Sequence, residues 1–149
     1  NCGYYINRDK LYSILRSNKY CIETAYDPCS YPGVKCKFYF NNETGFDIIT
    51  QRGQLVKEDR TMKMNELGDA KKYTEVSFMI FRTGSCLIVG NCTEEKLYFV
   101  YEFIKKMLYE EYPLIYVHNE IVQTKEKKTK LRKKKVIMTR EYYNDNIIS

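Results

Sequence analysis

The chain has 149 residues, of which 44% are hydrophobic, enough for one domain with a core but not for two full-sized domains. Its net charge is +6, but the segment Lys125–Lys135 carries +7, which leaves about −1 for the rest. The chain shows no apolar stretch of membrane-spanning length and no signal peptide, so we expect no membrane segment.

The cysteines and the single histidine bear on metal sites and on compartment. None of the six cysteines forms a C-x-x-C pair, and His118 is the only histidine, so we expect no zinc site, other metal or cofactor. Free thiols are typical of a reducing compartment, so we expect an intracellular protein. No nucleophile with its base, phosphate-binding loop or carboxylate pair stands out, so no catalytic residue is expected and the protein is predicted not to be an enzyme. The first residue is Asn rather than Met, which favours a fragment or a processed form.

The first forty residues predict a helix, an extended segment and a strand. Residues 7–17 have the apolar spacing of a helix, with Asn7 as N-cap. Residues 20–26 are expected to be extended, and Pro32-Gly33 bends the chain before the strand Val34–Phe40.

The next stretch, residues 41–74, has the weakest pattern. A turn is expected at 41–45, followed by a strand at 46–50 and a partner strand at 54–57. The remainder is mostly charged. We therefore expect either extra strands or a mobile loop in this stretch.

A hairpin and a long helix follow. Val76–Phe81 and Cys86–Val89 predict two strands joined by a tight turn at residues 82–85. A helix is predicted from Thr93 to Glu111, ending before Pro113.

The C-terminal part predicts a strand at 114–122, the basic run, and a possible strand at 135–142. The order of helices and strands predicts an α+β fold, with helices on one face of an antiparallel sheet.

Two segments resemble one repeat of the TATA-box-binding protein family. Residues 26–34, YDPCSYPGV, resemble the family's Tyr-Glu-Pro-x-x-Phe-Pro-Gly-Leu. Residues 78–90, FMIFRTGSCLIVG, resemble its Leu-Leu-Ile-Phe-x-Ser-Gly-Lys-Val-Val-Leu-Thr-Gly. The resemblance implies half of a saddle, a curved antiparallel sheet with two helices on one face. We therefore expect a repeat at residues 1–122 with an insertion at 41–74, and a basic tail or extension at 123–149.

The resemblance also implies a function and a site. Family members bind and bend A/T-rich promoter DNA through the minor groove to initiate transcription, and aromatic wedges unstack base steps. Carried over by position, the wedges fall at Tyr31 and Phe81, which we expect to lie near one another and to be more exposed than core aromatics. The other expected DNA-binding residues are those of the groove floor, a phosphate contact and the turn: Met79, Leu87, Val89, Lys37 and Arg82.

Several positions depart from the family pattern. Tyr31 replaces a wedge Phe, Ser85 replaces a Lys that contacts phosphate, and Val89 replaces a Thr that contacts a base edge. The family's base-reading Asn lies upstream of the first residue. Each change lowers affinity or sequence preference. Together with the composition, they suggest a divergent member such as that of a large DNA virus, acting in the nucleus or in a cytoplasmic viral factory.

The implied partners are double-stranded DNA, other transcription factors or RNA polymerase, and a second repeat supplied by a missing N-terminal half or by a homodimer. Two other functions stay open, a protein-interaction module of the same fold and a viral structural or packaging protein. The basic run is either a solvated tail, a phosphate-binding arm or a localisation signal. Its nucleic-acid-binding residues would be Lys127, Lys128, Lys130, Arg132, Lys133, Lys134 and Lys135.

Overall fold

The computed structural model describes residues 1–60, 72–118, 139–141 and 144. The chain divides into two compact units, residues 1–119 and 120–149. In the second unit Arg140 and Glu141 are helical, so the strand expected at 135–142 is wrong at these residues. A helix satisfies its backbone hydrogen bonds within one segment, whereas a strand needs a neighbour. The basic run at 125–135 lies outside the described residues.

The first unit is an α+β domain, as the sequence predicts. Its elements are, in chain order, β1 (Tyr5–Ile6), α1 (Arg8–Arg16), β2 (Glu23–Ala25), β3 (Val34–Asn41), β4 (Tyr73–Ile80), β5 (Cys86–Gly90), α2 (Glu94–Ile115) and β6 (Tyr116–Val117). No helix of the described residues is long and apolar enough to span a membrane.

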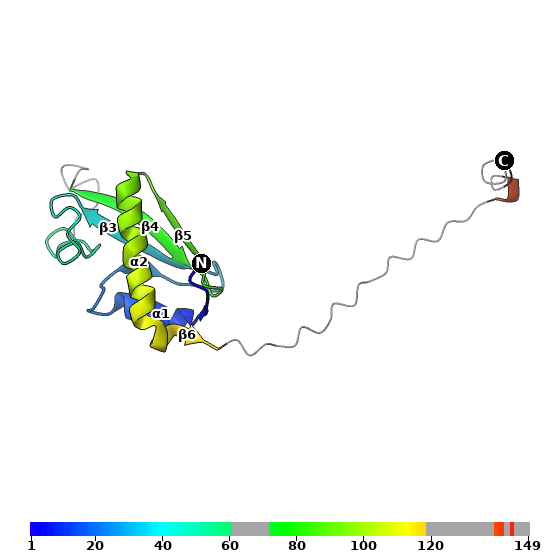
Figure 1. Cartoon of the computed structure of the whole chain (residues 1–149), viewed down its shortest axis with the longest axis horizontal. Helices are drawn as coiled ribbons and strands as arrows, with labels where there is room; N and C mark the ends of the chain where they lie inside the picture. Colours follow the sequence, from blue (N-terminus) through cyan, green and yellow to red (C-terminus); the bar gives the residue numbers. More distant parts are fainter. Residues whose placement is uncertain (61–71, 119–138, 142–143, 145–149) are drawn as a thin grey trace. The chain divides into compact units, whose positions relative to one another are not determined.

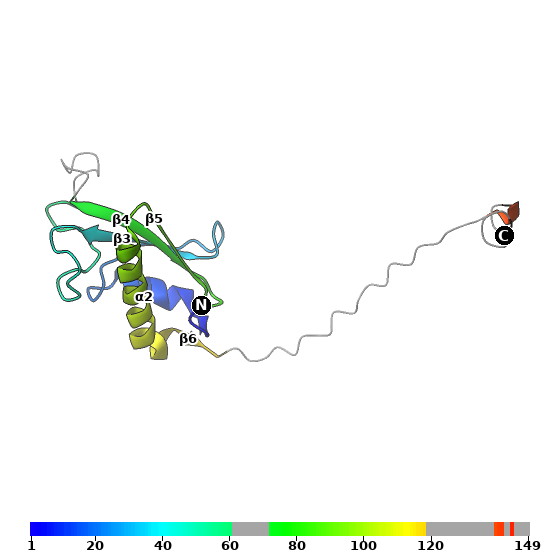
Figure 2. The ribbon, with the colours of Figure 1, turned by 45° about the horizontal axis from the view of Figure 1, so that its top comes forward.

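Four strands form one antiparallel sheet in the order β2-β3-β4-β5. The predicted hairpin is confirmed, since Met79 lies opposite Leu87 and Ser77 opposite Val89. The predicted strand at 34–40 lies beside it, with Lys35 opposite Met79. Figures 1 and 2 show a curved sheet with both helices on one face and α2 lying across the strands.

The two faces of the sheet differ because side chains alternate along each strand. The face against the helices carries the fully buried Phe38 and Phe78, which join one core with both helices. The opposite face, which we call the open face, faces away from the helices. It carries Lys35, Lys37, Ser77, Met79, Leu87 and Val89.

Helix α1 forms as predicted. The Asn7 side chain accepts a hydrogen bond from the backbone N–H of Lys10, which satisfies one free donor of the first turn. Leu11 and Leu15 are completely buried, one turn apart on the face that meets the core.

Helix α2 runs farther than predicted. It continues through Pro113 to Ile115, so the expected end before Pro113 is wrong. Proline leaves the carbonyl of Tyr109 without its helical donor, but Tyr109 is 84% exposed and water can replace that donor. The completely buried Ile115, whose carbonyl accepts from the backbone N–H of Asn7 at 2.7 Å, holds the last turn in place.

The described residues of the insertion between β3 and β4, 42–60 and 72, form turns and irregular segments instead of strands. Residues 46–50 and 54–57 do not enter a sheet, so the strands expected there are wrong. The insertion instead wraps around the edge of β3. Phe46 packs against Phe40 and Phe99 on the helix side, while the Gly53 carbonyl accepts from the backbone N–H of Tyr39 beyond the end of β2.

The ends of the unit meet in a two-stranded antiparallel sheet. Tyr5 lies opposite Val117 and Ile6 opposite Tyr116. The strand predicted at 114–122 is thus reduced among the described residues to β6, because residues 114 and 115 belong to α2.

Candidate nucleic-acid interface

The strand register places the predicted site residues in rows across the open face. One row runs through Lys35, Met79 and Leu87, and the next through Lys37, Ser77 and Val89. The two apolar residues of β5 stand clear of the core, with Leu87 48% and Val89 51% exposed. These two neighbouring aliphatic side chains therefore belong to the solvent-exposed surface of the sheet and not to the core.

The two predicted wedge residues lie together at one end of the open face. The ring centroids of Tyr31 and Phe81 are 5.9 Å apart, and both rings are partly exposed, unlike those of Phe38 and Phe78. The Tyr31 hydroxyl points at Sδ of Met79, 3.4 Å away. Proximity and exposure are therefore as predicted.

Gly33 allows the two rings to approach each other. A Cβ at this position would lie 2.9 Å from Cε1 of Tyr31 and 3.0 Å from Cε1 of Phe81, both closer than carbon atoms pack. The glycine of the Pro-Gly motif thus has a packing reason beyond its turn. Because Gly33 has no side chain, both rings can pack against its backbone.

The turn after β4 fixes Phe81. The Phe81 N–H donates to the Ser85 carbonyl and the Gly84 N–H donates to the Phe81 carbonyl. Gly84 has a φ of +83°, in the left-handed region that favours glycine. The backbone N–H of Cys2 donates to the Gly84 carbonyl, so the N-terminal segment supports the turn.

The positive charges of the site are of two kinds. Lys35 is exposed, and its ammonium lies 4.1 Å from the centroid of the Tyr31 ring, a cation–π contact. Lys37 instead lies 3.7 Å from Glu23 and 3.6 Å from Glu75, so two carboxylates on the same face compete with any phosphate.

Arg82, predicted to contact DNA, is exposed in the turn. Its guanidinium lies 5.5 Å from the centroid of the Tyr5 ring. The structure therefore brings Tyr31, Phe81, Met79, Leu87 and Val89 onto one surface, with Arg82 at its end. The predicted basic residues from Lys127 to Lys135 lie outside the described residues.

The sequence did not reveal how the opposite end of the open face is closed. Tyr39 and Tyr73 point to this face but are each only 5% exposed. The Tyr73 hydroxyl donates to Asp59 of the insertion at 2.6 Å, and Asp59 also pairs with Lys72 at 2.8 Å. The hydrogen bonds from Lys72 and Tyr73 lower the pKa of Asp59.

This closure limits the candidate interface to the end near the aromatic pair. In the sequence, the only sign of this closure is a tyrosine at two strand positions, 39 and 73, where an exposed strand would carry charged residues. That sign is too weak to identify a covered surface. The Tyr39 hydroxyl is also engaged, donating to Glu23 at 2.6 Å, and burial is the main cause of its raised pKa.

The chain matches no known family profile, no curated protein and no solved structure.

Proposed function

We propose that the open face binds the minor groove of double-stranded DNA and bends it, and that the protein is a DNA-binding transcription-initiation factor. The observation that carries the proposal is the pair of partly exposed rings, Tyr31 and Phe81, standing next to exposed Leu87 and Val89 on a sheet face without helices. Apolar side chains on such a surface suit the minor groove, and aromatic rings at its end suit insertion between base steps.

Lys35 supports the same proposal. Its ammonium lies over Tyr31, so a ring that entered a base step would bring a positive charge near the backbone phosphates. The resemblance to the TATA-box-binding protein family adds the A/T preference and the need for a second repeat, from a preceding segment or a second copy.

The test measures binding and bending of end-labelled A·T-rich and G·C-rich duplexes by fluorescence anisotropy and energy transfer. Phe81→Ala and Tyr31→Ala are expected to reduce bending while leaving unfolding nearly unchanged, because both rings are partly exposed. The matched control is Tyr109→Ala, an exposed aromatic on α2, which should leave bending unchanged. A loss of about 3–5 kcal/mol in the free energy of unfolding of Phe81→Ala would place the ring in the core and contradict the wedge.

A protein-interaction module is the second candidate. It is favoured by the two carboxylates that pair with Lys37. Affinity for DNA comes from cations that are free to neutralise phosphates, and Lys37 is already paired. Wild-type protein that shows no preference for A·T-rich duplex and does not bend it would favour this candidate, with the open face as the surface that meets the partner.

A further inference from the structure

A cavity of about 960 Å³ lies between α2 and the insertion. One wall is α2 from Glu94 to Glu110, the other is the segment 46–52, and Lys19 and Tyr20 lie beside Glu110. We call it the helix–loop groove. It shares no residue with the candidate DNA interface on the open face.

The helix–loop groove is mainly apolar and strongly exposed at its rim. Phe99, Phe103 and Met107 of α2 line it together with Phe46 of the insertion. Ile48 is 71% exposed, Ile49 78% and Tyr98 62%. Two adjacent exposed isoleucines on the loop and an exposed tyrosine on α2 thus form an apolar rim of the kind that binding partners cover.

The insertion holds its shape without these isoleucines. Gln51 is only 4% exposed, and its side-chain amide donates to the backbone carbonyls of Asn41 and Gly45 and to the Thr44 hydroxyl. Its amide oxygen accepts from the backbone N–H of Asn41 at 3.0 Å. The exposure of Ile48 and Ile49 therefore serves no internal packing, and the groove exists before any ligand arrives, which lowers the cost of binding.

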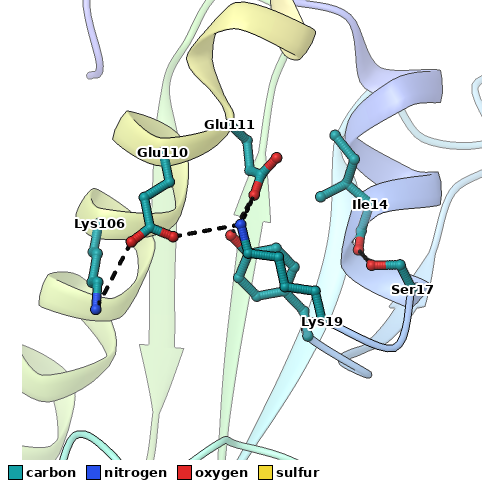
Figure 3. Close-up of polar contacts among 7 residues, drawn as sticks. Ile14, Ser17, Lys19, Lys106, Glu110 and Glu111 are labelled. Atoms are coloured by element: carbon teal, nitrogen blue, oxygen red, sulfur yellow. Dashed lines mark hydrogen bonds and ion pairs between the residues drawn. The ribbon is translucent and has the colours of Figure 1, made fainter.

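The charges along the groove differ between its two ends. Near the end of α2, Lys19 pairs with both Glu110 and Glu111, and Lys106 pairs with Glu110 (Figure 3). These charges satisfy one another and leave little for a ligand.

At the start of α2 the balance is negative. Glu94 and Glu95 are exposed, and Glu102 follows two turns later. Among the described residues lining this half, Arg52 is the only cation. The two carboxylates of the first turn interact favourably with the helix dipole, but they are exposed to solvent and can also pair with a cationic side chain of a ligand.

We propose that the helix–loop groove binds an amphipathic helix of a partner protein, with large apolar side chains toward Ile48, Ile49 and Tyr98 and basic residues toward Glu94 and Glu95. The wall from Glu94 to Glu110 is about 24 Å long at 1.5 Å per residue, which matches a helix of about four turns. An apolar groove with charge at one end is the usual receptor for such a helix. The proposal does not depend on DNA binding.

The test uses two synthetic peptides of about 14 residues, both with leucines on one helical face and with either lysines or glutamates on the other. Their binding to the full chain is measured by fluorescence anisotropy. The lysine peptide is expected to bind at least about tenfold more tightly than the glutamate peptide. The net charge of the chain, +6, favours the opposite order, so non-specific attraction cannot give the expected result.

Three double variants, one of them a control, test where the peptide binds. Ile48→Ser with Ile49→Ser should weaken the lysine peptide about tenfold or more, because two apolar side chains at the rim are replaced by small polar ones. The matched control, Tyr109→Ser with Leu114→Ser, removes two exposed apolar residues of α2 outside the groove and should leave binding unchanged. Glu94→Gln with Glu95→Gln should reduce the preference for the lysine peptide.

Three results would overturn the proposal. They are tighter binding of the glutamate peptide, equal loss of binding in the control variant, and self-association of the chain that Ile48→Ser with Ile49→Ser disperses in sedimentation. The last result would assign the groove to a second copy. Duplex binding measured on the same variants should stay unchanged, so the outcome is separate from that of the DNA proposal.

Discussion

Because Gly33 has no side chain, the rings of Tyr31 and Phe81 can lie close to its backbone. The rings of Tyr31 and Phe81 occupy the space that a Cβ would need. Gly33 itself is buried beneath them. The geometry of the proposed wedge therefore depends on a residue that cannot contact DNA through a side chain.

Gly33→Ala should push the two rings apart and reduce DNA bending. Because both rings are partly exposed and can move, the free energy of unfolding should fall by only about 1 kcal/mol. Energy transfer on an end-labelled A·T-rich duplex measures the bend, and urea denaturation measures the stability. Unchanged bending would mean that the ring pair is not the wedge.

Glu111 joins α2 to the segment after α1. Its side chain is 7% exposed and accepts hydrogen bonds from Lys19 and from the Tyr20 hydroxyl. The bond from Lys19, with that from Tyr20, holds the pKa of Glu111 below its ordinary value of 4.5. Burial, together with the bond to Glu111, raises the pKa of Tyr20 to about 12.

The lowered pKa of Glu111 predicts that the free energy of unfolding falls in acid. Because the folded-state pKa of Glu111 is lowered, its contribution is complete above the unfolded value of 4.5 and disappears as the pH falls through the folded value. Glu111→Gln should cost about 1–3 kcal/mol at neutral pH, and the difference from wild type should shrink below pH 4.5.

Urea denaturation across this pH range measures the effect. Glu110→Gln, the more exposed neighbour on the same helix, is the control and should show a much smaller difference at neutral pH. If wild type remained more stable than Glu111→Gln by the same amount below pH 4.5, the carboxylate of Glu111 would not be the source of the stabilisation.

The start of the insertion after β3 is held by the hydrogen bonds of one buried side chain, Gln51. Gln51 bonds to residues at the start of the insertion and at the end of β3, which closes the segment 41–51 into a compact loop. Phe46 then packs this loop onto the core.

Gln51→Ala should release this loop. Removing a buried amide leaves the Asn41 N–H and carbonyls without their partner, at a cost of about 2 kcal/mol in the free energy of unfolding. Hydrogen exchange of residues 42–52 should accelerate while β4 and β5 stay protected. Arg52→Ala, an exposed neighbour, is the stability control. Uniform acceleration over the whole sheet would contradict a local role.

The elements that the sequence predicts are those whose pattern is local. Alternation in 34–40 and the turn glycine at 84 determine strands and hairpin within a few residues, and the cap at Asn7 does the same for α1. The insertion and the end of α2 depend on distant contacts, of Gln51 with β3 and of Ile115 with Asn7. Such contacts leave no periodic signal in the sequence.

The candidate site divides in the same way. The Pro-Gly and hairpin motifs predict the residues of the open face, because the register of two adjacent strands follows from the short turn between them. That the insertion covers Tyr73 could not be predicted, since it requires Asp59 to meet a residue across the fold.

For the whole molecule, the basic run and the open face should make separable contributions to DNA binding. Deleting residues 125–135 should lower overall affinity and flatten the dependence of log affinity on log salt by about 0.9 for every phosphate that the run neutralises. The preference for A·T-rich duplex should remain, because phosphate contacts carry no sequence information. A titration at several salt concentrations with both duplexes measures these quantities. Binding that vanishes with the run, from a chain without A·T preference, would exclude the open face as the reader.

The small sheet of β1 and β6 determines how this domain would respond to a pulling force. Tyr5 lies opposite Val117, so tension between the N-terminal end and the chain after residue 117 separates the two strands like a zipper. Hydrogen bonds loaded in this direction break one after another instead of all at once. Tension from the C-terminal side therefore reaches this latch first, whereas tension from the N-terminal end also loads the turn between β4 and β5 through the hydrogen bond from Cys2 to the Gly84 carbonyl. The pairing of β1 with β6 is thus the point at which the domain first yields to a pull on its C-terminal segment.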